Sequence, residues 1–511
     1  MVIWPLVGYK NGLLAGEPLS TRKENRDGIA ENKNQGTNEC DVMIISSTEI
    51  QEAFDGRNYY IPSFFRIKLG VFANLMDVPN IPFGSFAVFF HEYVHYLQDV
   101  TTLYGLMNLS VTTYFVRSVA HKVVEMSDGE FDVPQEIEDD DRDFGFRNLC
   151  FRKYYVGSSI NPKHKIVDVL KYEVLNDVVK GQPIEYVQVE YCDKVTGTDH
   201  KCVFGGNILT EGMAYMTERR CYQSVFSENG CEYPDAADYP YMMNWKLAEI
   251  IYPELAKYLE IIVGVADIAL LTYNPGLTFV RFLEYLKEND YAETLNGKGY
   301  LDKIEDCDNL YKIGYEFTSF SIEKLTQVQD YVYNEIAEYF KMPIAVELND
   351  WVSRVWEKAK QLRKIAPHYI LDVILGYWGD VRNNKVFCSI YLGLGTPLVI
   401  NADDEGTIVP PEGFKPSENF MPGLYWAIDE IRRIFGGDSC AKECLLKGYC
   451  SWSSTQEGSN IIVNERCDTA PWLRAKEDMD YCPVGAIWRH WGLTGHTPRF
   501  KDETDNTLML G

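Results

Sequence analysis

The sequence lacks a hydrophobic run long enough to cross a membrane. Its longest apolar stretch, around residues 259–271, contains Glu260 and Asp267 and is shorter than the ~20 residues that span a bilayer. The first six residues carry neither the basic region nor the small-residue cleavage site of a secretory signal. The thirteen cysteines are scattered and odd in number, which favours reduced thiols. We therefore expect a cytoplasmic protein with no membrane contact.

Positive charge is scarce. Lys and Arg number 49 against 75 Asp and Glu, which gives a formal net charge of −26. Such a surface repels phosphate backbones, so we expect no nucleic-acid partner. Nine of the acids fall within residues 127–143 against one base, Arg142. We expect a solvated acidic loop there; the alternative is a patch that recruits a basic substrate.

The motifs of several large enzyme classes are missing. No P-loop and no GxSxG nucleophile elbow occur. The nearest approach to a dinucleotide-binding GxGxxG is Gly393-Leu394-Gly395, but Leu398 stands where the third glycine should be. We read this stretch as a turn.

The overall composition is that of a globular protein, with 46% hydrophobic and 24% charged residues. Polar breaks at residues 16–39, 127–143 and 401–417 suggest three regions. These are an N-terminal region, 1–80, with a polar loop; a main domain, 81–400, with an acidic insertion; and a Cys- and Trp-rich C-terminal subdomain, 418–511, beyond a linker. The predicted fold class is α+β, dominated by helices.

Apolar periodicity predicts most of the helices. One long helix should begin after Pro82, with Ser85 as its N-cap, and continue past Gly105 towards Glu125. Further helices are expected over residues 209–223, 245–259, 278–287, 322–340, 350–364 and 421–435. Strand signals are fewer: residues 185–192 and 200–204 should form a hairpin, and residues 385–392 a further strand.

The sharpest motif is an HExxH pattern, His91 to His95, inside the long apolar helix. Residues four apart lie on one helical face, so both imidazoles can reach a single Zn²⁺. Glu92 lies beside them and can take a proton from the attacking water. Without a metal, these polar groups would each need a buried partner, which is costly. Satisfied core histidines are the alternative.

A catalytic zinc needs a third protein ligand. The metzincin continuation is excluded, because Gln98 and Thr101 replace its glycine and histidine. Glu211 is the favoured candidate; Glu218, seven residues later on the same helical face, and His121 are the alternatives. Gly212 should let another backbone approach closely. Asp99 either orients a ligand imidazole or is a solvated acid.

The HExxH followed by the sequence TEGMAY resembles the gluzincin zinc metallopeptidases, whose third ligand is the glutamate of an E-G-x-A motif. The resemblance rests on two short motifs. It implies a zincin-like core in which His91, His95 and Glu211 bind zinc and Glu92 is the general base. Two features depart from the pattern. The gap between the motifs is long, and Tyr215 replaces the aspartate that thermolysin-like enzymes carry four residues after the ligand glutamate.

Tyr215 has two readings. Its hydroxyl could hydrogen-bond the oxyanion that develops during peptide hydrolysis, which makes it a candidate catalytic residue. The alternative is a tyrosine of the core.

The C-terminal region holds a second cluster of possible ligands, namely Cys440, Cys444, Cys450, Cys467 and Cys482. Four thiolates can hold a structural zinc or an iron–sulfur cluster. The spacing matches neither template, since a CxxC pair is missing, so a second metal is a weak prediction. Buried reduced thiols are the alternative.

The sequence therefore predicts a zinc metallopeptidase that acts on a specific protein or peptide, of basic character if the acidic surface selects it. The first alternative is a non-enzymatic interaction protein, stabilised by metal and docking a partner through its Cys-rich tail. An iron–sulfur redox protein is a weaker third. The oligomeric state stays open.

Overall fold

The computed structural model describes residues 59–61, 65–135, 146–179, 182–295, 304–375, 380–417, 420–437, 442–456, 459–476 and 481–500. The predicted polar loop, residues 16–39, lies outside these ranges, as do Cys440 and the acidic residues 136–143. All described residues belong to one compact unit, residues 45–511. The predicted domain boundaries stay predictions.

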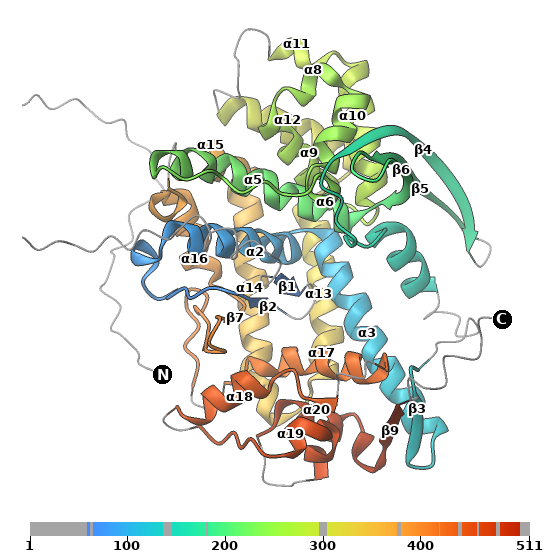
Figure 1. Cartoon of the computed structure of the whole chain (residues 1–511), viewed down its shortest axis with the longest axis vertical. Coiled ribbons are helices and arrows are strands. Elements are labelled where there is room, and N and C mark those ends of the chain that lie inside the picture. Colours follow the sequence, from blue (N-terminus) through green and yellow to red (C-terminus); the bar gives the residue numbers. More distant parts are fainter. Residues whose placement is uncertain are drawn as a thin grey trace, which may run out of the picture. The chain divides into compact units, whose positions relative to one another are not determined.

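The fold is a helix-dominated α+β arrangement with small sheets (Figure 1). The longer helices are α2 (Phe83–Thr101), α3 (Leu103–Met126), α5 (Gly206–Glu228), α7 (Met243–Ile251), α9 (Leu259–Leu270), α10 (Pro275–Glu288), α12 (Ile304–Thr318), α13 (Ile322–Tyr339), α14 (Val346–Ile365), α16 (Lys385–Leu394) and α17 (Gly423–Phe435). The shorter ones are α6 (Asp238–Tyr241), α8 (Pro253–Ala256), α11 (Tyr291–Thr294), α15 (Tyr369–Leu375), α18 (Lys447–Ser454), α19 (Arg466–Thr469) and α20 (Pro483–His490). Residues Phe146–Val156 form a π-helical segment.

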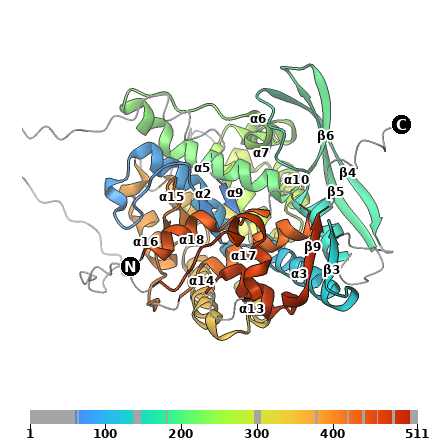
Figure 2. The same cartoon turned by 60° about the horizontal axis from the view of Figure 1, so that its bottom comes forward.

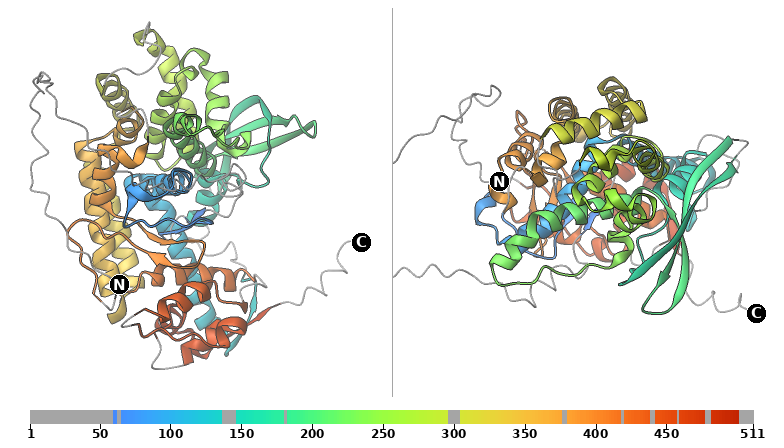
Figure 3. Two further views of the ribbon diagram at one scale, coloured as in Figure 1. Left: turned by 60° about the vertical axis from the view of Figure 1, so that its left-hand side comes forward. Right: turned by 90° about the horizontal axis from the view of Figure 1, so that it is seen from above.

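Strands make three small sheets. The first contains β1 (Tyr59–Ile61), β2 (Arg66–Lys68), β7 (Leu398–Ile400) and β8 (Gly406–Thr407), and its β2–β7 pair is parallel. The second pairs β3 (Glu130–Val133) with β9 (Thr497–Phe500) in parallel. The third is an antiparallel meander of β4 (Val167–Val179), β5 (Gln182–Asp193) and β6 (Thr198–Phe204). Figures 2 and 3 show this meander as a twisted layer beside the helices.

The predicted long helix is two helices. It begins at Phe83, with Pro82 rather than Ser85 as the N-cap residue, and it is interrupted at Thr102. The Thr102 backbone is extended, and its hydroxyl accepts a hydrogen bond from the Gly105 N–H at 3.0 Å, which caps α3. A Cβ at Gly105 would lie 2.3 Å from the Asp99 Cα, so the close approach of the two helices requires glycine here.

The predicted strand at 385–392 is wrong, because these residues form α16. Val, Phe, Ile and Tyr favour a strand locally, but the buried positions Phe387, Ile390, Tyr391 and Leu394 follow a helical spacing. The Asn384 side chain accepts hydrogen bonds from two backbone N–H groups of the first turn, at 2.9 and 3.1 Å, and so caps the helix.

The predicted hairpin is confirmed by β5 and β6, while β4 was not predicted. The acidic segment 127–143 is not a loop throughout, since β3 lies inside it and pairs with β9 from the C-terminal region. Residues 401–417, predicted as a linker, contain β8 and bury Val409 and Phe414. In the described part of the chain, no helix combines the length and apolarity that a membrane span requires.

Candidate metal centre

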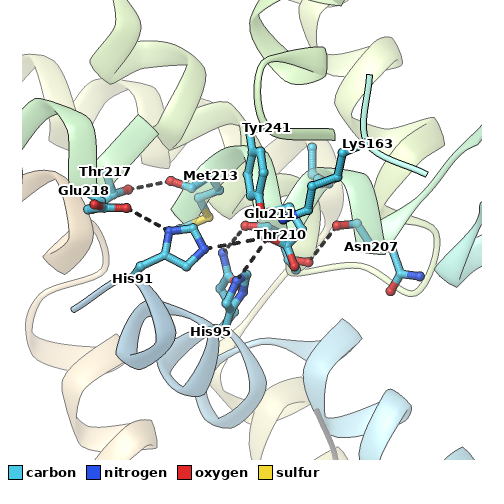
Figure 4. Close-up of polar contacts among 12 residues, drawn as sticks. His91, His95, Lys163, Asn207, Thr210, Glu211, Met213, Thr217, Glu218 and Tyr241 are labelled. Carbon is cyan, nitrogen blue, oxygen red and sulfur yellow. Dashed lines mark hydrogen bonds and ion pairs between the residues drawn. The ribbon is translucent and has the colours of Figure 1, made fainter. Parts of the chain in front are cut away.

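The centre is built on the packing of α5 against α2. Nearly all of α2 is buried, and α5 turns the face that carries Glu211 towards it (Figure 4). Gly212 follows Glu211, and a Cβ at this position would lie 2.5 Å from Nδ2 of Asn244. The neighbour that requires glycine is therefore a side chain and not the backbone that the sequence suggested. Asn244 in turn donates to the Leu209 carbonyl at 2.9 Å, which ties α7 to α5.

Two imidazoles and one carboxylate converge on a single point. Nε2 of His91 and Nε2 of His95 lie 3.7 and 3.6 Å from the same oxygen, Oε2 of Glu211. The three ligand atoms all lie within 4.8 Å of one another. Separations of 3.6–3.7 Å exceed hydrogen-bond length. They approach the roughly 3.3–3.6 Å edge of a tetrahedron around zinc, given bonds of about 2.0–2.2 Å.

On the side away from Glu211, the Nδ1 atom of each imidazole is held by a hydrogen bond. Nδ1 of His91 donates to Oε2 of Glu218 at 3.0 Å, and Nδ1 of His95 donates to Oε1 of Gln98 at 2.9 Å. Gln98 is itself held by donating to the Thr210 carbonyl at 3.1 Å. Both Nε2 atoms therefore face Glu211, and holding the rear nitrogen in this way is how outer partners orient histidine ligands in metal sites.

Glu218 consequently occupies a different place from that of a third ligand. It meets the rear nitrogen of His91, whereas Glu211 faces the front nitrogens of both rings. The buried acid that holds the His91 ring therefore comes seven residues after Glu211 on the same helix. Gln98 is the residue that orients the His95 ring, and Asp99 is buried and is therefore not a solvated acid.

His121 lies away from the centre. It is exposed on α3, where its Nδ1 is 3.2 Å from a Glu125 carboxylate oxygen. Tyr215 is buried beside α6, with its ring 5.6 Å from the Tyr241 ring, and its hydroxyl bonds to the backbone of Ala236. The hydroxyl of Tyr215 is therefore engaged with the chain.

Glu92 lies next to both imidazoles. It is buried on α2, and its negative charge contributes to raising the pKa of His91 and of His95. A buried carboxylate beside both imidazoles is placed to exchange a proton with a molecule bound between them.

The ionisable side chains of the centre strongly affect one another's pKa values. Burial alone would lower the pKa of His91, but its interactions with Glu211 and Glu218 outweigh burial and raise that pKa to about 10. The same attraction to His95 and His91 overcomes burial and lowers the pKa of Glu211. The two carboxylates therefore favour positive charge between the rings, which protons or a divalent cation can supply.

Two residues of the centre carried no sequence signal. Tyr241, on α6, places its ring 6.2 Å from the His91 ring, and its hydroxyl accepts a hydrogen bond from Nζ of Lys163 at 2.6 Å (Figure 4). Burial, followed by the charges of Glu211 and Glu92, raises the pKa of Tyr241 well above its usual value. The hydroxyl therefore stays protonated and can donate.

Open space beside the centre is small. A cavity of about 20 Å³ adjoins His95 and has room for about one water molecule. It is lined by His95, Gln98, Asp99, Tyr104, Asn108, Asn207 and Thr210. The side chains of His91, His95 and Glu211 are 13, 10 and 18% exposed, so the convergence point is largely shielded from solvent.

The C-terminal cysteines behave differently. Cys444, Cys450, Cys467 and Cys482 are buried, and burial, followed by nearby Glu430 and other thiols, raises the pKa of Cys444. Among the described residues, no group of three with metal-ligand spacing includes a cysteine. The weak prediction of a second metal at these thiols stays a prediction.

Comparison with known proteins gives no relative: no family model, curated protein or solved structure matches the chain. The function of the centre therefore has to be inferred from its own geometry and chemistry.

Proposed function

We propose that the protein is a zinc metallopeptidase with a zincin-like catalytic core. One observation carries the proposal: Nε2 of His91 and of His95 meet one oxygen of Glu211 at 3.7 and 3.6 Å, while Glu218 and Gln98 hold the rings from behind. Two imidazoles and a carboxylate are a donor set that suits zinc, and three protein ligands leave a fourth position for substrate or water.

The surrounding residues support peptide hydrolysis. Zinc held by this set would polarise a carbonyl and bring the pKa of a water molecule near 7. Glu92 takes the proton of the attacking water and passes it to the departing amine. The hydroxyl of Tyr241, supported by Lys163, donates to the carbonyl oxygen as negative charge develops there. Tyr241 thus replaces Tyr215 as the favoured oxyanion donor.

The surroundings also favour a selective enzyme. The side chains of His91, His95 and Glu211 are mostly shielded from solvent, so an extended segment reaches them more readily than a folded protein surface does. The net charge of −26 attracts cationic molecules. We therefore favour a protein or peptide substrate of basic character.

Metal content per chain tests the proposal. Mass spectrometry of protein purified without chelator should give zinc at the centre, and Glu211→Ala should lose about one equivalent. Glu228→Ala, at the exposed end of the same helix, is the matched control and should retain it. Zinc that is absent from wild type, or unaffected by Glu211→Ala, would contradict the proposal. Zinc held by four protein ligands, seen by X-ray absorption, would favour the interaction-protein alternative.

A further inference from the structure

We propose a second metal site, formed by His164, Asp193 and His200 at one end of the β4–β5–β6 sheet. One ligand atom from each residue can be chosen so that all three lie within 4.8 Å of one another. Nδ1 of His164 is 3.2 Å from Oδ2 of Asp193, and the two imidazole ring centroids are 4.5 Å apart. This site shares no ligand with the proposed peptidase centre.

The sheet brings the three residues together from separate segments. Asp193 ends β5, and His200 lies on β6 opposite Tyr191. His164 precedes β4 and forms a two-hydrogen-bond bridge with Tyr239, at 3.3 and 3.1 Å. Backbone pairing therefore holds each ligand before any metal binds, which reduces the entropy lost on binding.

The carboxylate is oriented by its own turn. Oδ1 of Asp193 accepts from the Val195 N–H at 2.9 Å, and Oδ2 accepts from the Thr196 hydroxyl at 2.9 Å. The only other partner of Oδ2 among the described residues is Nδ1 of His164. A cation would replace that one N–H contact and leave the two orienting bonds in place, as outer hydrogen bonds do in metal sites.

The imidazole of His200 distinguishes this cluster from a simple His–Asp pair. The His200 side chain makes no hydrogen bond to the described residues, and its ring stacks on Tyr191 with a centroid distance of 5.4 Å and an interplanar angle of 25°. The side chains of His164 and Asp193 are only 12 and 5% exposed. Two imidazoles beside one buried carboxylate form a donor set for Zn²⁺, Ni²⁺ or Cu²⁺ rather than for Ca²⁺ or Mg²⁺.

The site adjoins the segments that complete the first centre. His164 follows Lys163 directly, and its bridge partner Tyr239 is two residues from Tyr241 on α6. Lys163 and Tyr241 are themselves joined by the 2.6 Å hydrogen bond. A metal at the second site would thus fasten the segment that positions the Tyr241 hydroxyl.

Metal titration in a background without the first centre tests the site. H95A/E211A should still bind about one equivalent of Co²⁺ or Zn²⁺, and adding His200→Ala or His200→Gln should abolish that binding. His121→Ala, an exposed histidine on α3, is the matched control and should leave binding unchanged. Circular dichroism checks that each variant is folded.

X-ray absorption identifies the ligands of the metal bound in this background. Nitrogen and oxygen neighbours alone would support the site. Sulfur neighbours would show that the metal binds to cysteines and would overturn the proposal. Metal binding that the His200 variants do not change would also overturn it, as would the absence of any binding to H95A/E211A. The experiment also distinguishes a failure of this proposal from a failure of the first centre. In the wild-type background, His200→Ala should lower the metal content by about one equivalent per chain, whether or not Glu211 binds metal.

Discussion

Two buried polar clusters lie along α2, and they differ in how completely their own hydrogen bonds are satisfied. Near the C-terminal end, Arg363 uses all five of its N–H groups: two meet Asp267 at 2.6 Å, two meet Thr101 and one meets the Pro367 carbonyl. In the middle of the helix, His91 and His95 face Glu211 at distances too long for hydrogen bonds.

The difference separates a structural cluster from a binding centre. The Arg363 cluster balances its own charge and satisfies its own donors, so it requires nothing from outside the chain. The histidine centre instead directs Nε2 of His91 and of His95 at one Glu211 oxygen, while Glu218 and Gln98 hold the two rings. Changes in the first cluster should therefore affect folding, and changes in the second should affect metal binding and catalysis.

The largest effect is expected from Glu92→Gln. It removes the proton acceptor but keeps the size of the side chain, so we expect peptide hydrolysis to fall by about 10²–10⁴-fold while zinc content stays at the wild-type level. Single-turnover cleavage of a basic peptide library with metal analysis on the same sample provides the measurement. Wild-type cleavage by the variant would remove Glu92 from the mechanism.

Asp267→Asn should act on stability alone. It leaves the Arg363 guanidinium buried without its counter-charge, and breaking such a pair costs about 3–5 kcal/mol of unfolding free energy. Asp350→Asn is the matched control, because the Asp350–Arg354 pair is exposed and should contribute less than about 1 kcal/mol. Urea unfolding compares the two variants. Equal midpoints would show that the buried pair is not the stabilising element.

Tyr241→Phe and Tyr215→Phe separate the residue that the structure favours from the one that the sequence suggested. Loss of an oxyanion donor costs about 10²–10³-fold in kcat. We expect that loss for Tyr241→Phe, with KM little changed, and a nearly unaltered kcat for Tyr215→Phe. The reverse order would restore the original assignment of Tyr215.

Local patterns account for what the sequence could predict. His91 and His95 are related by helical geometry alone, and α13 follows its apolar period to within one residue of the predicted 322–340. Strand β4 was missed because its alternation is interrupted, with a register shift between Val169 and Lys171.

The contacts that could not be predicted are all long-range. Tyr241 is one of 34 tyrosines, and only the turn into α6 brings it over His91. The approach of Lys163 to Tyr241 depends on the bridge between His164 and Tyr239, which joins segments about 75 residues apart. The role of Glu218 could not be predicted either, because it depends on which nitrogen of the His91 ring the carboxylate faces.

Glu218→Gln gives the smallest effect and the sharpest test of that role. The amide can still occupy the space behind His91, but it carries no charge to hold the ring as a zinc ligand. Loss of such an outer partner weakens metal affinity by about 10–100-fold. Competition with a chelator of known affinity measures this, and Glu228→Gln, exposed on the same helix, is the control. If Glu218 were itself a zinc ligand, Glu218→Gln should lose as much metal affinity as Glu211→Ala. Glu218 instead lies 3.0 Å from Nδ1 of His91, whereas Glu211 lies on the Nε2 side. We therefore expect a partial loss of zinc binding for Glu218→Gln and a complete loss for Glu211→Ala.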